Sequence, residues 1–347
     1  MDDGRWSVAF PRDWWYPACR SSDLGRRPVA VPLMERPLVL FRGAGGRPVA
    51  LLDRCPHRNY PLSLGRVVGG GELECGYHGW RFDGAGDCAC VPGLLDGAAR
   101  SPARRVPGHA AVERDGMVWV WGEPDRAPTR EPFALPVVDG PGAGEAVLRC
   151  DLDATLHAAV ENALDVPHTA FAHRGVFRGG ARRRLTAVRR ELDGGVEVRY
   201  LGEPVGFGRF RPAGATRTFD HWDRFLLPSV AQVEYAVDGW FRLVNTVLHL
   251  PMAPVRTRAW FVVRWWSRLP AAAVRPVVLA RGRRILGQDA AVLAAQSARI
   301  AATGGERFAS TELDLVGNAV WLLLRRAERG DGDGAGEPVG RTVTFEA

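Results

Sequence analysis

The sequence contains no lysine, so all 46 of its basic residues are arginine. Against 39 acidic residues they leave a formal net charge of +7. The arginines are dispersed and form no basic stripe interleaved with aromatic side chains, which argues against nucleic-acid binding. Two interpretations of the excess charge stay open, a solvated basic surface and electrostatic steering of an acidic partner protein.

Long hydrophobic runs are missing as well. The densest, from Ala319 to Leu324, is far shorter than the roughly 20 apolar residues that a membrane-spanning helix needs. Residues 1–5 lack the basic-then-apolar order of a secretory signal peptide. We therefore expect no membrane association and a cytoplasmic location.

Cysteine is scarce, with six residues in 347. Four of them have no regular spacing and are expected to be free thiols in a reducing compartment; these are Cys19, Cys88, Cys90 and Cys150. A single Cys-x-Cys such as 88–90 is too weak a signal to predict a metal site. The other two, Cys55 and Cys75, each lie close to a histidine.

Two Cys-plus-His pairs occur between residues 55 and 80, Cys55-x-His57 and Cys75-x-x-His78, across an interval that a hairpin can close. Two thiolates and two imidazoles suit a two-iron, two-sulfide cluster in which one iron takes the sulfurs and the other the nitrogens. A structural zinc is the alternative, because mixed Cys and His sets also bind zinc. Zinc ribbons more often repeat Cys-x-x-Cys. A structural zinc also gives no reason for the aromatic and glycine residues around the second histidine, Tyr-His-Gly-Trp at 77–80.

The stretch resembles both halves of the Rieske iron–sulfur motif, including the Gly79-Trp80 that follows the second histidine. This resemblance implies that a [2Fe-2S] cluster is bound by Cys55, His57, Cys75 and His78.

A second group of polar residues lies between Glu161 and His173. Glu161, Asp165 and His168 are spaced four and three apart and would share one face of a helix. His168 and His173 are five apart, so a π-like bulge or a break is needed to bring both to one point. Pro167 is a plausible cause, because it disfavours helical geometry at the preceding residue. Two histidines and one carboxylate with open positions are the ligand set of ferrous iron that activates dioxygen.

Residues 162–173 resemble the mononuclear iron motif of Rieske non-haem oxygenases, Asn-x-x-Asp-x-x-His-x-x-x-x-His. The resemblance implies that His168 and His173 bind iron and that Asn162 lies close to it. It also implies that Asp165 bridges to the second cluster histidine of a neighbouring subunit.

Residues 273–300 are predicted to form a long helix, with an apolar stripe of Val278, Ile285, Val292 and Ile300. Asp289 and Gln296 fall on the same stripe. A carboxylate on a buried face must be paired or bound to a metal, which makes Asp289 the candidate third iron ligand. The alternative is an ion pair with an arginine such as Arg284. The family's setting for this ligand resembles Gln288-Asp289 with Gln296, although glutamine stands where glutamate is common.

The pattern of short strands predicts an α+β protein. An N-terminal all-β Rieske [2Fe-2S] domain, residues 1–136, precedes a catalytic mononuclear-iron domain, residues 137–347, with an antiparallel sheet packed by helices in a helix-grip-like manner. Expected strands of the first domain are 29–32, 38–41, 49–52 and 118–121, and those of the second are 148–153, 196–200, 207–210, 225–227, 230–237, 241–250 and 260–266. Residues 313–329 are expected to form a second helix, and the chain after residue 330 a tail.

Some side chains of this sheet could face a substrate pocket, namely Tyr235, Phe241, Asn245 and His249. Ordinary sheet positions are an equally good interpretation of each. Three further histidines are expected to be structural: His109, His157 and His221.

The resemblance implies an oxygenase of the homomeric monooxygenase or demethylase type, which oxidises a small cyclic or aromatic molecule with O2. Electrons would come from NAD(P)H through a flavin reductase, a ferredoxin or both, to the cluster and then to Fe(II). It also implies a homotrimer, because the two centres of one chain would be too far apart. The alternative is a non-enzymatic Rieske electron carrier with a ligand-binding domain, which would need no second iron site.

Overall fold

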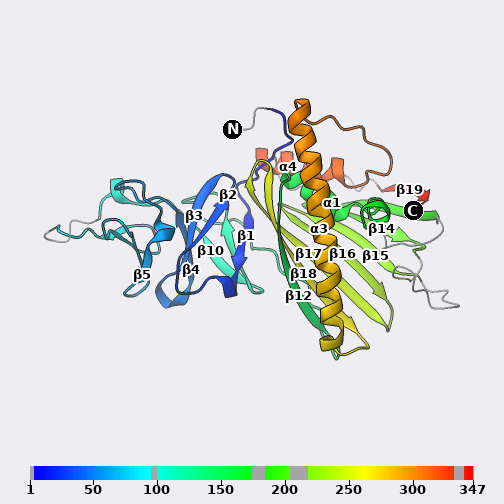
Figure 1. The fold of residues 1–347 in the computed structure, drawn as a ribbon, viewed down its shortest axis with the longest axis horizontal. Helices are drawn as coiled ribbons and strands as arrows, with labels where there is room; N and C mark the ends of the chain where they lie inside the picture. Colours follow the sequence, from blue (N-terminus) through cyan, green and yellow to red (C-terminus); the bar gives the residue numbers. More distant parts are fainter. Residues whose placement is uncertain (1–3, 95–99, 174–183, 204–217, 332–339, 347) are drawn as a thin grey trace. The chain divides into compact units, whose positions relative to one another are not determined.

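The computed structural model describes residues 4–94, 100–173, 184–203, 218–331 and 340–346 (Figure 1). Their contacts divide the chain into two compact units, Pro11–Leu135 and a second one made of Met1–Phe10 with Pro136–Ala347. The division differs from the expected domains, 1–136 and 137–347, in the first ten residues. The backbone N–H of Ser7 donates to Glu306 at 2.8 Å, which ties this segment to the second unit. We retain a domain boundary near residue 136 as a proposal.

The unit Pro11–Leu135 is built from short antiparallel strands (Figure 1). The strands are β1 Trp15–Arg20, β2 Val29–Leu33, β3 Arg36–Arg42, β4 Pro48–Leu52, β5 Arg66–Val68, β6 Glu72–Glu74, β7 Arg81–Phe82, β8 Cys88–Cys90, β9 Gly108–His109, β10 Ala111–Arg114 and β11 Met117–Trp121. They form three sheets with the orders β1-β11-β10, β2-β3-β4-β9 and β5-β6-β7-β8. The four strands expected here are confirmed, each within about two residues.

One apolar cluster joins two of these sheets, β2-β3-β4-β9 and β5-β6-β7-β8, and it includes the two cysteines of the motif. Cys55 and Cys75 are each 2% exposed and pack with Phe41, Leu73 and Phe82 among others. Burying both thiols in one core brings together two loops that are 20 residues apart in sequence.

Gly65 lets the chain approach the loop that carries Cys75. A Cβ atom at this position would lie 2.1 Å from the Glu74 carbonyl oxygen, so only glycine fits without a backbone shift.

The second unit contains one antiparallel sheet of eight strands in the order β12-β18-β17-β16-β15-β14-β13-β19. Its strands are β12 Gly144–Leu152, β13 Arg184–Leu192, β14 Gly195–Leu201, β15 Asp220–Leu226, β16 Val230–Val237, β17 Phe241–Ala253, β18 Arg256–Ser267 and β19 Arg341–Glu346. The expected strands are confirmed, except that 207–210 lies outside the described residues. Alternate residues of these strands face the helices, so that one side of the sheet can form the floor of a cavity.

The expected tail is wrong for residues 341–346. They form β19, which pairs with β13 from Arg184↔Glu346 to Arg189↔Arg341. The segment alternates polar and apolar residues, and that pattern is stabilised by a neighbouring edge strand more than 150 residues away in sequence.

In the described part of the chain, four helices accompany the sheet: α1 Leu156–Leu164, α2 Thr169–Ala172, α3 Ala271–Thr303 and α4 Gly317–Arg329. The long helix α3 lies across one face of the sheet and packs on β12 (Figure 1). Gly282 allows a close approach, because a Cβ atom there would lie 2.4 Å from Leu148 Cδ1. No helix among the described residues is long and apolar enough to cross a membrane.

The apolar stripe expected on α3 is partly wrong. Val292 is 47% exposed, whereas the buried residues are Leu286, Leu293, Ser297 and Ile300. A seven-residue spacing drifts by about 20° per step around a straight α-helix, so the buried face moves off the expected positions along the helix.

The helix expected from residue 313 begins later, at Gly317. Asp314 accepts hydrogen bonds from the backbone N–H and the hydroxyl of Thr311, and this local turn delays the helix.

Candidate iron centres

The two cysteine loops of the first unit have the same backbone design. The N–H of Cys55 donates to the Tyr60 carbonyl at 2.9 Å, and the N–H of Cys75 donates to the Trp80 carbonyl at 2.8 Å. In each loop the residue four positions after the cysteine has a positive φ, 58° at Asn59 and 70° at Gly79. The N–H of that residue donates back to the cysteine carbonyl. Two such turns therefore present their cysteine and histidine side chains in the same manner.

The two cysteine thiols lie beside each other, and so do the two histidine rings. The Cys55 thiol is hydrogen-bonded to the Cys75 thiol, and the rings of His57 and His78 lie with centroids 4.5 Å apart. Trp80 stacks on His57 at 4.8 Å with an interplanar angle of 3°. A sulfur pair beside a nitrogen pair is the arrangement required by a cluster in which two cysteines bind one iron and two histidines bind the other.

The protonation preferences of these groups also fit such a cluster. Burial raises the pKa of the Cys55 thiol to about 11, with the Cys75 thiol adding to the shift, so metal binding must release this proton. Burial, together with the charges of His78 and Arg58, lowers the pKa of His57 and favours the neutral imidazole that binds metal. His57 Nδ1 is buried and has no hydrogen-bond partner among the described residues.

In the second unit, the helix α1 ends before the histidines are reached. It stops at Leu164, Asp165 has extended backbone dihedrals, and the one-turn helix α2 follows from Thr169. The expected break is thus confirmed, and the expectation that Glu161, Asp165 and His168 share one helix face is wrong. The break turns His168 and His173 toward the same point.

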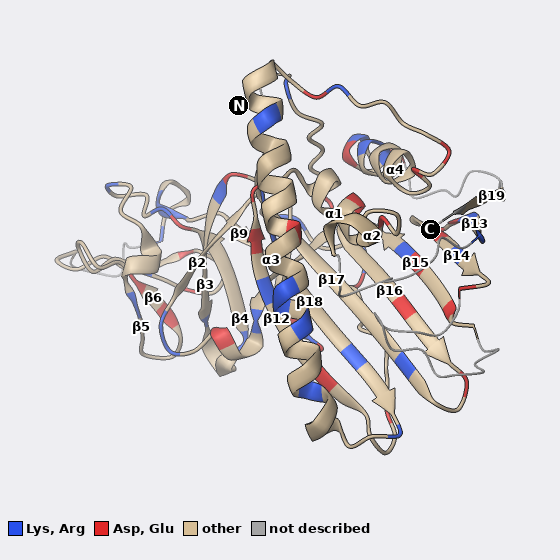
Figure 2. Ribbon diagram, turned by 45° about the vertical axis from the view of Figure 1, so that its right-hand side comes forward, with Lys and Arg blue, Asp and Glu red and all other residues tan. Residues whose placement is uncertain are grey.

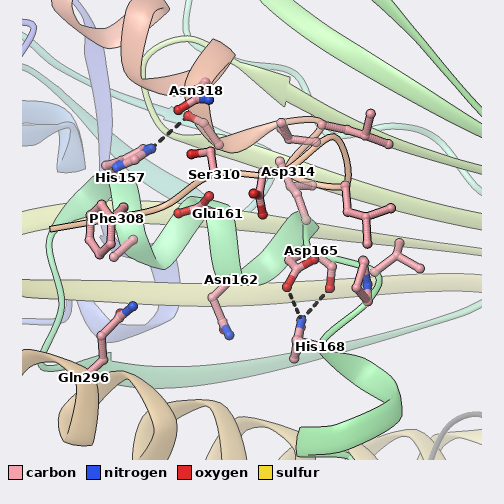
Figure 3. A pocket seen from close by; sticks show the side chains of 18 of the residues that line it. His157, Glu161, Asn162, Asp165, His168, Gln296, Phe308, Ser310, Asp314 and Asn318 are labelled. Carbon is pink, nitrogen blue, oxygen red and sulfur yellow. Dashed lines mark hydrogen bonds and ion pairs between the residues drawn. The ribbon is translucent and has the colours of Figure 1, made fainter. Parts of the chain in front are cut away.

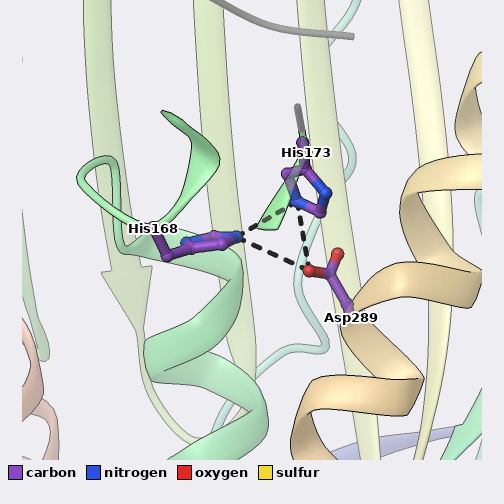
Figure 4. A group of neighbouring side chains, drawn as sticks. All are labelled: His168, His173 and Asp289. Carbon is purple, nitrogen blue, oxygen red and sulfur yellow. Dashed lines mark hydrogen bonds and ion pairs between the residues drawn. The ribbon is translucent and has the colours of Figure 1, made fainter. Parts of the chain in front are cut away.

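Figure 4 shows His168 and His173 facing Asp289, which comes from α3. The two Nε2 atoms are 3.1 Å apart, and Asp289 Oδ1 lies 3.1 Å from His173 Nε2 and 3.5 Å from His168 Nε2. Three ligand atoms at right angles around a metal, each at about 2.1 Å, are about 3 Å apart. The three side chains therefore match one face of an octahedron.

The hydrogen-bond partners of the two imidazole rings indicate that the ring protons are on Nδ1. The two Nε2 atoms and Asp289 Oδ1, which face one another, then carry no proton. His173 Nδ1 donates to Gln288 Oε1 at 3.0 Å, and His168 Nδ1 donates to the Asp165 carbonyl. In the neutral rings both Nε2 atoms then carry lone pairs. Asp289 Oδ1 is buried, and its polar neighbours among the described residues are these two Nε2 atoms. Lone pairs gathered in this way repel each other unless a cation lies between them.

The titration of His168 points to the same preference for positive charge. Burial opposes its protonation, but hydrogen bonds with Asp165 and Asp289 and the charges of both carboxylates outweigh burial and raise its pKa to about 9. Asp289 makes no ion pair with Arg284 among the described residues; both ion pairs found for it are with His168 and His173. The arrangement of these donors favours a cation over the alternative Arg284 pairing.

A cavity of about 310 Å³ opens directly onto this triad. Its floor is the inner face of β15 to β18 and one wall is α3, so that most of the lining is apolar. Three of the four sheet residues considered as pocket residues line it, Tyr235, Phe241 and Asn245. The fourth, His249, is fully buried and its Nδ1 bonds to the Ser229 carbonyl. An apolar chamber with a few polar groups next to a metal triad suits an organic substrate.

A second cavity, about 420 Å³, lies on the other side of α1 and is more polar (Figure 3). Asn162, Asp165 and His168 line both cavities. The Asp165 side chain is 39% exposed, and its Oδ2 lies 3.5 Å from His168 Nδ1. Asp165 is therefore the one carboxylate of the motif that is reachable from the polar side and also contacts a member of the triad.

The histidines expected to be structural do have internal partners. His109 Nδ1 bonds to the Trp121 carbonyl at 2.8 Å and His157 Nε2 to the Gly317 carbonyl at 2.9 Å. His221 is fully buried between two carboxylates, with Nδ1 2.6 Å from Glu203 and Nε2 3.1 Å from Asp223. The sequence carried no signal for this last group, because Glu203 and Asp223 meet only across the folded sheet.

The His221 cluster predicts a pH-dependent contribution to stability. Burial lowers the pKa of His221, but Asp223 and Glu203 outweigh burial and raise it to about 9, while Tyr200 and Tyr235 stack on its faces. A histidine whose pKa is higher in the folded than in the unfolded state stabilises the fold when it is protonated. This stabilisation is complete below pH 6.5 and is lost as the pH rises through 9. Between pH 6 and 10 we expect the wild type to lose on the order of 3 kcal/mol more unfolding free energy than His221→Gln. Urea unfolding at both pH values measures this, and parallel curves for the two proteins would contradict it.

Comparison with known proteins gives two family matches. Residues 14–98 match the Rieske [2Fe-2S] domain, and residues 152–330, more than half of the chain, match the vanillate O-demethylase oxygenase C-terminal domain. The oxygenase component of dicamba O-demethylase from Stenotrophomonas maltophilia is 34% identical over 62% of this chain and 64% of its own length. Pheophorbide a oxygenase from Oryza sativa subsp. japonica is 34% identical over 72% of this chain and 48% of its own length.

These relatives are matched over only part of their length, about a quarter to two thirds for the first few. Among solved structures, dicamba monooxygenase bound to 3,6-dichlorosalicylic acid superimposes with a TM-score of 0.78 at 24% identity, covering 93% of this chain and 99% of that one. The superposition establishes the same fold: an all-β Rieske domain followed by a catalytic domain with a large antiparallel sheet. The chain belongs to the Rieske non-haem iron oxygenases, in the family with a catalytic domain of the vanillate O-demethylase oxygenase type.

Proposed function

We propose that this protein is the terminal component of a Rieske-type monooxygenase, which uses O2 and externally supplied electrons to oxidise a small organic molecule. The observation that carries the proposal is the triad His168, His173 and Asp289, with three donor atoms around one point at the wall of an apolar cavity. A simple electron carrier would have no use for this triad.

The proposed cofactors divide the chemistry. When bound, a [2Fe-2S] cluster at Cys55, His57, Cys75 and His78 would supply single electrons, and Fe(II) at the triad would supply dioxygen activation. The chain's own residues orient these groups. Gln288 and the Asp165 carbonyl accept hydrogen bonds from the two Nδ1 atoms, which favours the tautomer whose Nε2 lone pair would be available to the metal. Asn162 lines the same cavity and is proposed to lie close to the iron.

The proposed substrate is a cyclic or aromatic molecule. The cavity volume of about 310 Å³ is in the lower part of the range for small-molecule sites. Relatives are named as dicamba O-demethylase, vanillate O-demethylase and pheophorbide a oxygenase, which are names of oxidations on aromatic or macrocyclic compounds. We propose the insertion of one oxygen atom, as in hydroxylation or O-demethylation, rather than the dioxygenation of an arene.

The electrons are proposed to come from NAD(P)H through a flavin reductase, a ferredoxin or both, in the cytoplasm. The relatives' names "oxygenase component" and "oxygenase subunit" support this, because they describe parts of multicomponent systems. The excess of arginine over acidic residues would favour an acidic electron donor.

We propose a homotrimer in which Asp165 of one chain meets His78 of the next. The accessibility of both side chains supports it, since His78 is exposed and the Asp165 side chain is 39% exposed. Light scattering on the purified protein is expected to give three times the chain mass of 37.9 kDa, or a multiple of the trimer. A monomer that turns over at full rate would contradict this assembly.

Iron counting and oxygen uptake test the function together. The anaerobically reconstituted protein should hold about three irons per chain as an oxygenase and about two as a carrier. With reductase and NADH, a screen of methoxylated and polycyclic aromatic compounds should find some that stimulate oxygen uptake, with product masses showing added oxygen or lost methyl groups. Zinc in place of the cluster, or no metal at the triad, would refute the proposal.

A further inference from the structure

One acidic residue of the sheet faces the cavity beside the triad. Charged residues lie at intervals along β15 and β16 (Figure 2), but of the acidic residues on the described strands only Asp223 lines this cavity. The Asp223 side chain is 1% exposed, and a carboxylate so buried is stable only when it is paired or hydrogen-bonded. Asp223 Oδ1 lies 3.1 Å from His221 Nε2, so the imidazole stabilises it.

The same imidazole holds a second carboxylate at its other nitrogen. His221 Nδ1 lies 2.6 Å from Glu203 Oε2. The Glu203 side chain is 10% exposed, whereas that of His221 is fully buried. Glu203, His221 and Asp223 therefore form a continuous hydrogen-bonded chain, with one end near solvent and the other end at the cavity.

Two tyrosines fix the ring in this position. Tyr200 and Tyr235 stack on its two faces, with centroids 4.6 Å and 4.0 Å away, so each ring nitrogen stays turned to its carboxylate. A proton can then enter the imidazole at Nδ1 and leave at Nε2 without rotation of the side chain. Burial opposes protonation of His221, but Asp223 and Glu203 outweigh burial and raise its pKa to about 9. At neutral pH the ring therefore holds a proton that it can pass on.

Monooxygenation consumes protons inside the cavity. In the balanced reaction, R–H, O2, two electrons and two protons give R–OH and H2O. The C–H and O–O bonds break, a C–O bond forms, the external donor supplies the electrons, and both protons come from solvent. An organic molecule in the apolar cavity excludes water, so protein groups must carry these protons. Of the three lining carboxylates, Asp289 is proposed to bind iron and Asp165 to connect the two centres, which leaves Asp223.

We propose that Glu203, His221 and Asp223 form a proton relay, which carries protons from the solvent side to the cavity while oxygen is reduced there. Asp223 gives its carboxyl proton to the reduced oxygen and takes the Nε2 proton of His221. His221 is then reprotonated at Nδ1 by Glu203, which takes a proton from solvent. This inference rests on the proposed function and adds the proton source of the same reaction.

The test follows reoxidation of the cluster after the fully reduced holoenzyme is mixed with oxygen and anisole, a small aromatic ether, in H2O and in D2O. The rate can be read whether anisole is oxidised or the oxygen leaves as H2O2, because both outcomes use two protons. Asp223→Asn keeps the shape of the side chain but cannot pass a proton on, and it should slow reoxidation about 100-fold. It should also raise the solvent deuterium isotope effect above that of the wild type, since proton delivery becomes rate-limiting.

Glu203→Gln should change both quantities in the same direction. Its site is the most exposed of the three, so this variant keeps the test open if a buried variant does not fold. The matched control is Glu234→Gln on β16. Glu234 is also a buried carboxylate, but it pairs with Arg242 at 2.8 Å and lies outside the cavity lining, so the wild-type rate and isotope effect are expected.

Wild-type rates in both Asp223→Asn and Glu203→Gln would overturn the inference. Slower reoxidation with an unchanged isotope effect would do the same, because it indicates a structural role, and so would an equal loss in Glu234→Gln. Iron content separates this result from a failure of the proposed function. If the wild type holds three irons per chain and reduces oxygen while the variants match it, only the relay is wrong. If the triad holds no iron, or the loaded wild type reduces no oxygen, the proposed function is wrong and the relay with it.

Discussion

Replacing His173 with alanine is expected to remove one iron per chain, leaving about two, and to lower substrate oxidation at least about 100-fold. His173 Nε2 lies 3.1 Å from both other donor atoms. Because the His173 side chain is only 2% exposed, water does not readily take its place as a ligand. The remaining pair, His168 and Asp289, offers only two donors to a metal that needs a complete facial set. The visible spectrum of the cluster should not change, because its ligands belong to the other unit.

The matched control is Arg284→Gln on α3. It removes the arginine that the sequence offered as an alternative partner for Asp289, yet it should leave iron content and turnover unchanged. Gln288→Ala should have an intermediate effect, about tenfold, because it removes only the acceptor that orients His173. Iron analysis and oxygen uptake on the same preparations measure all three variants. Three irons per chain in His173→Ala would exclude the residue as a ligand.

The cluster motif could be recognised from sequence because its residues act within short loops. Spacing alone indicated Cys55 and His57 in one turn and Cys75 and His78 in another. The equivalence of the two turns was not visible, since one uses Asn59 and the other Gly79 at the position with positive φ. Asparagine and glycine are the residues that adopt this conformation most readily, so the same turn geometry arises from two different residues.

Asp289 could be selected because a carboxylate on a helix stripe needs a partner, even though part of the stripe was displaced by helical drift. For its neighbour Gln288 the sequence indicated only a glutamine at a position where glutamate is common in the family. Its bond to His173 spans 115 residues of sequence, and no local pattern indicates it. The same limitation applies to the pairing of β19 with β13 and to the contacts of His221 with Glu203 and Asp223. Register across a large sheet is a property of the whole fold, not of any one strand.

Asp165→Asn is expected to keep about three irons per chain and a normal cluster spectrum while lowering substrate oxidation about 100-fold. The backbone carbonyl of residue 165 bonds to His168 Nδ1, and asparagine leaves that bond in place. The change therefore removes only the carboxylate charge, whose Oδ2 lies 3.5 Å from the same nitrogen. A carboxylate that accepts from two ligating histidines couples their metals, whereas an amide oxygen is a weaker acceptor and carries no charge.

The decisive measurement is the rate at which the cluster is reoxidised after reduction, in the presence of substrate and oxygen. If Asp165 connects the two centres, this rate should fall together with turnover, while oxygen-independent reduction of the cluster by the reductase is unaffected. Asp314→Asn, in the same polar cavity, keeps its side-chain oxygen for the Thr311 turn and should behave like the wild type. Normal reoxidation in Asp165→Asn would place the electron route elsewhere, and loss of the third iron would reduce Asp165 to a support for His168. Only slow reoxidation of the cluster, together with full iron content at the triad, is consistent with a carboxylate bridge between subunits.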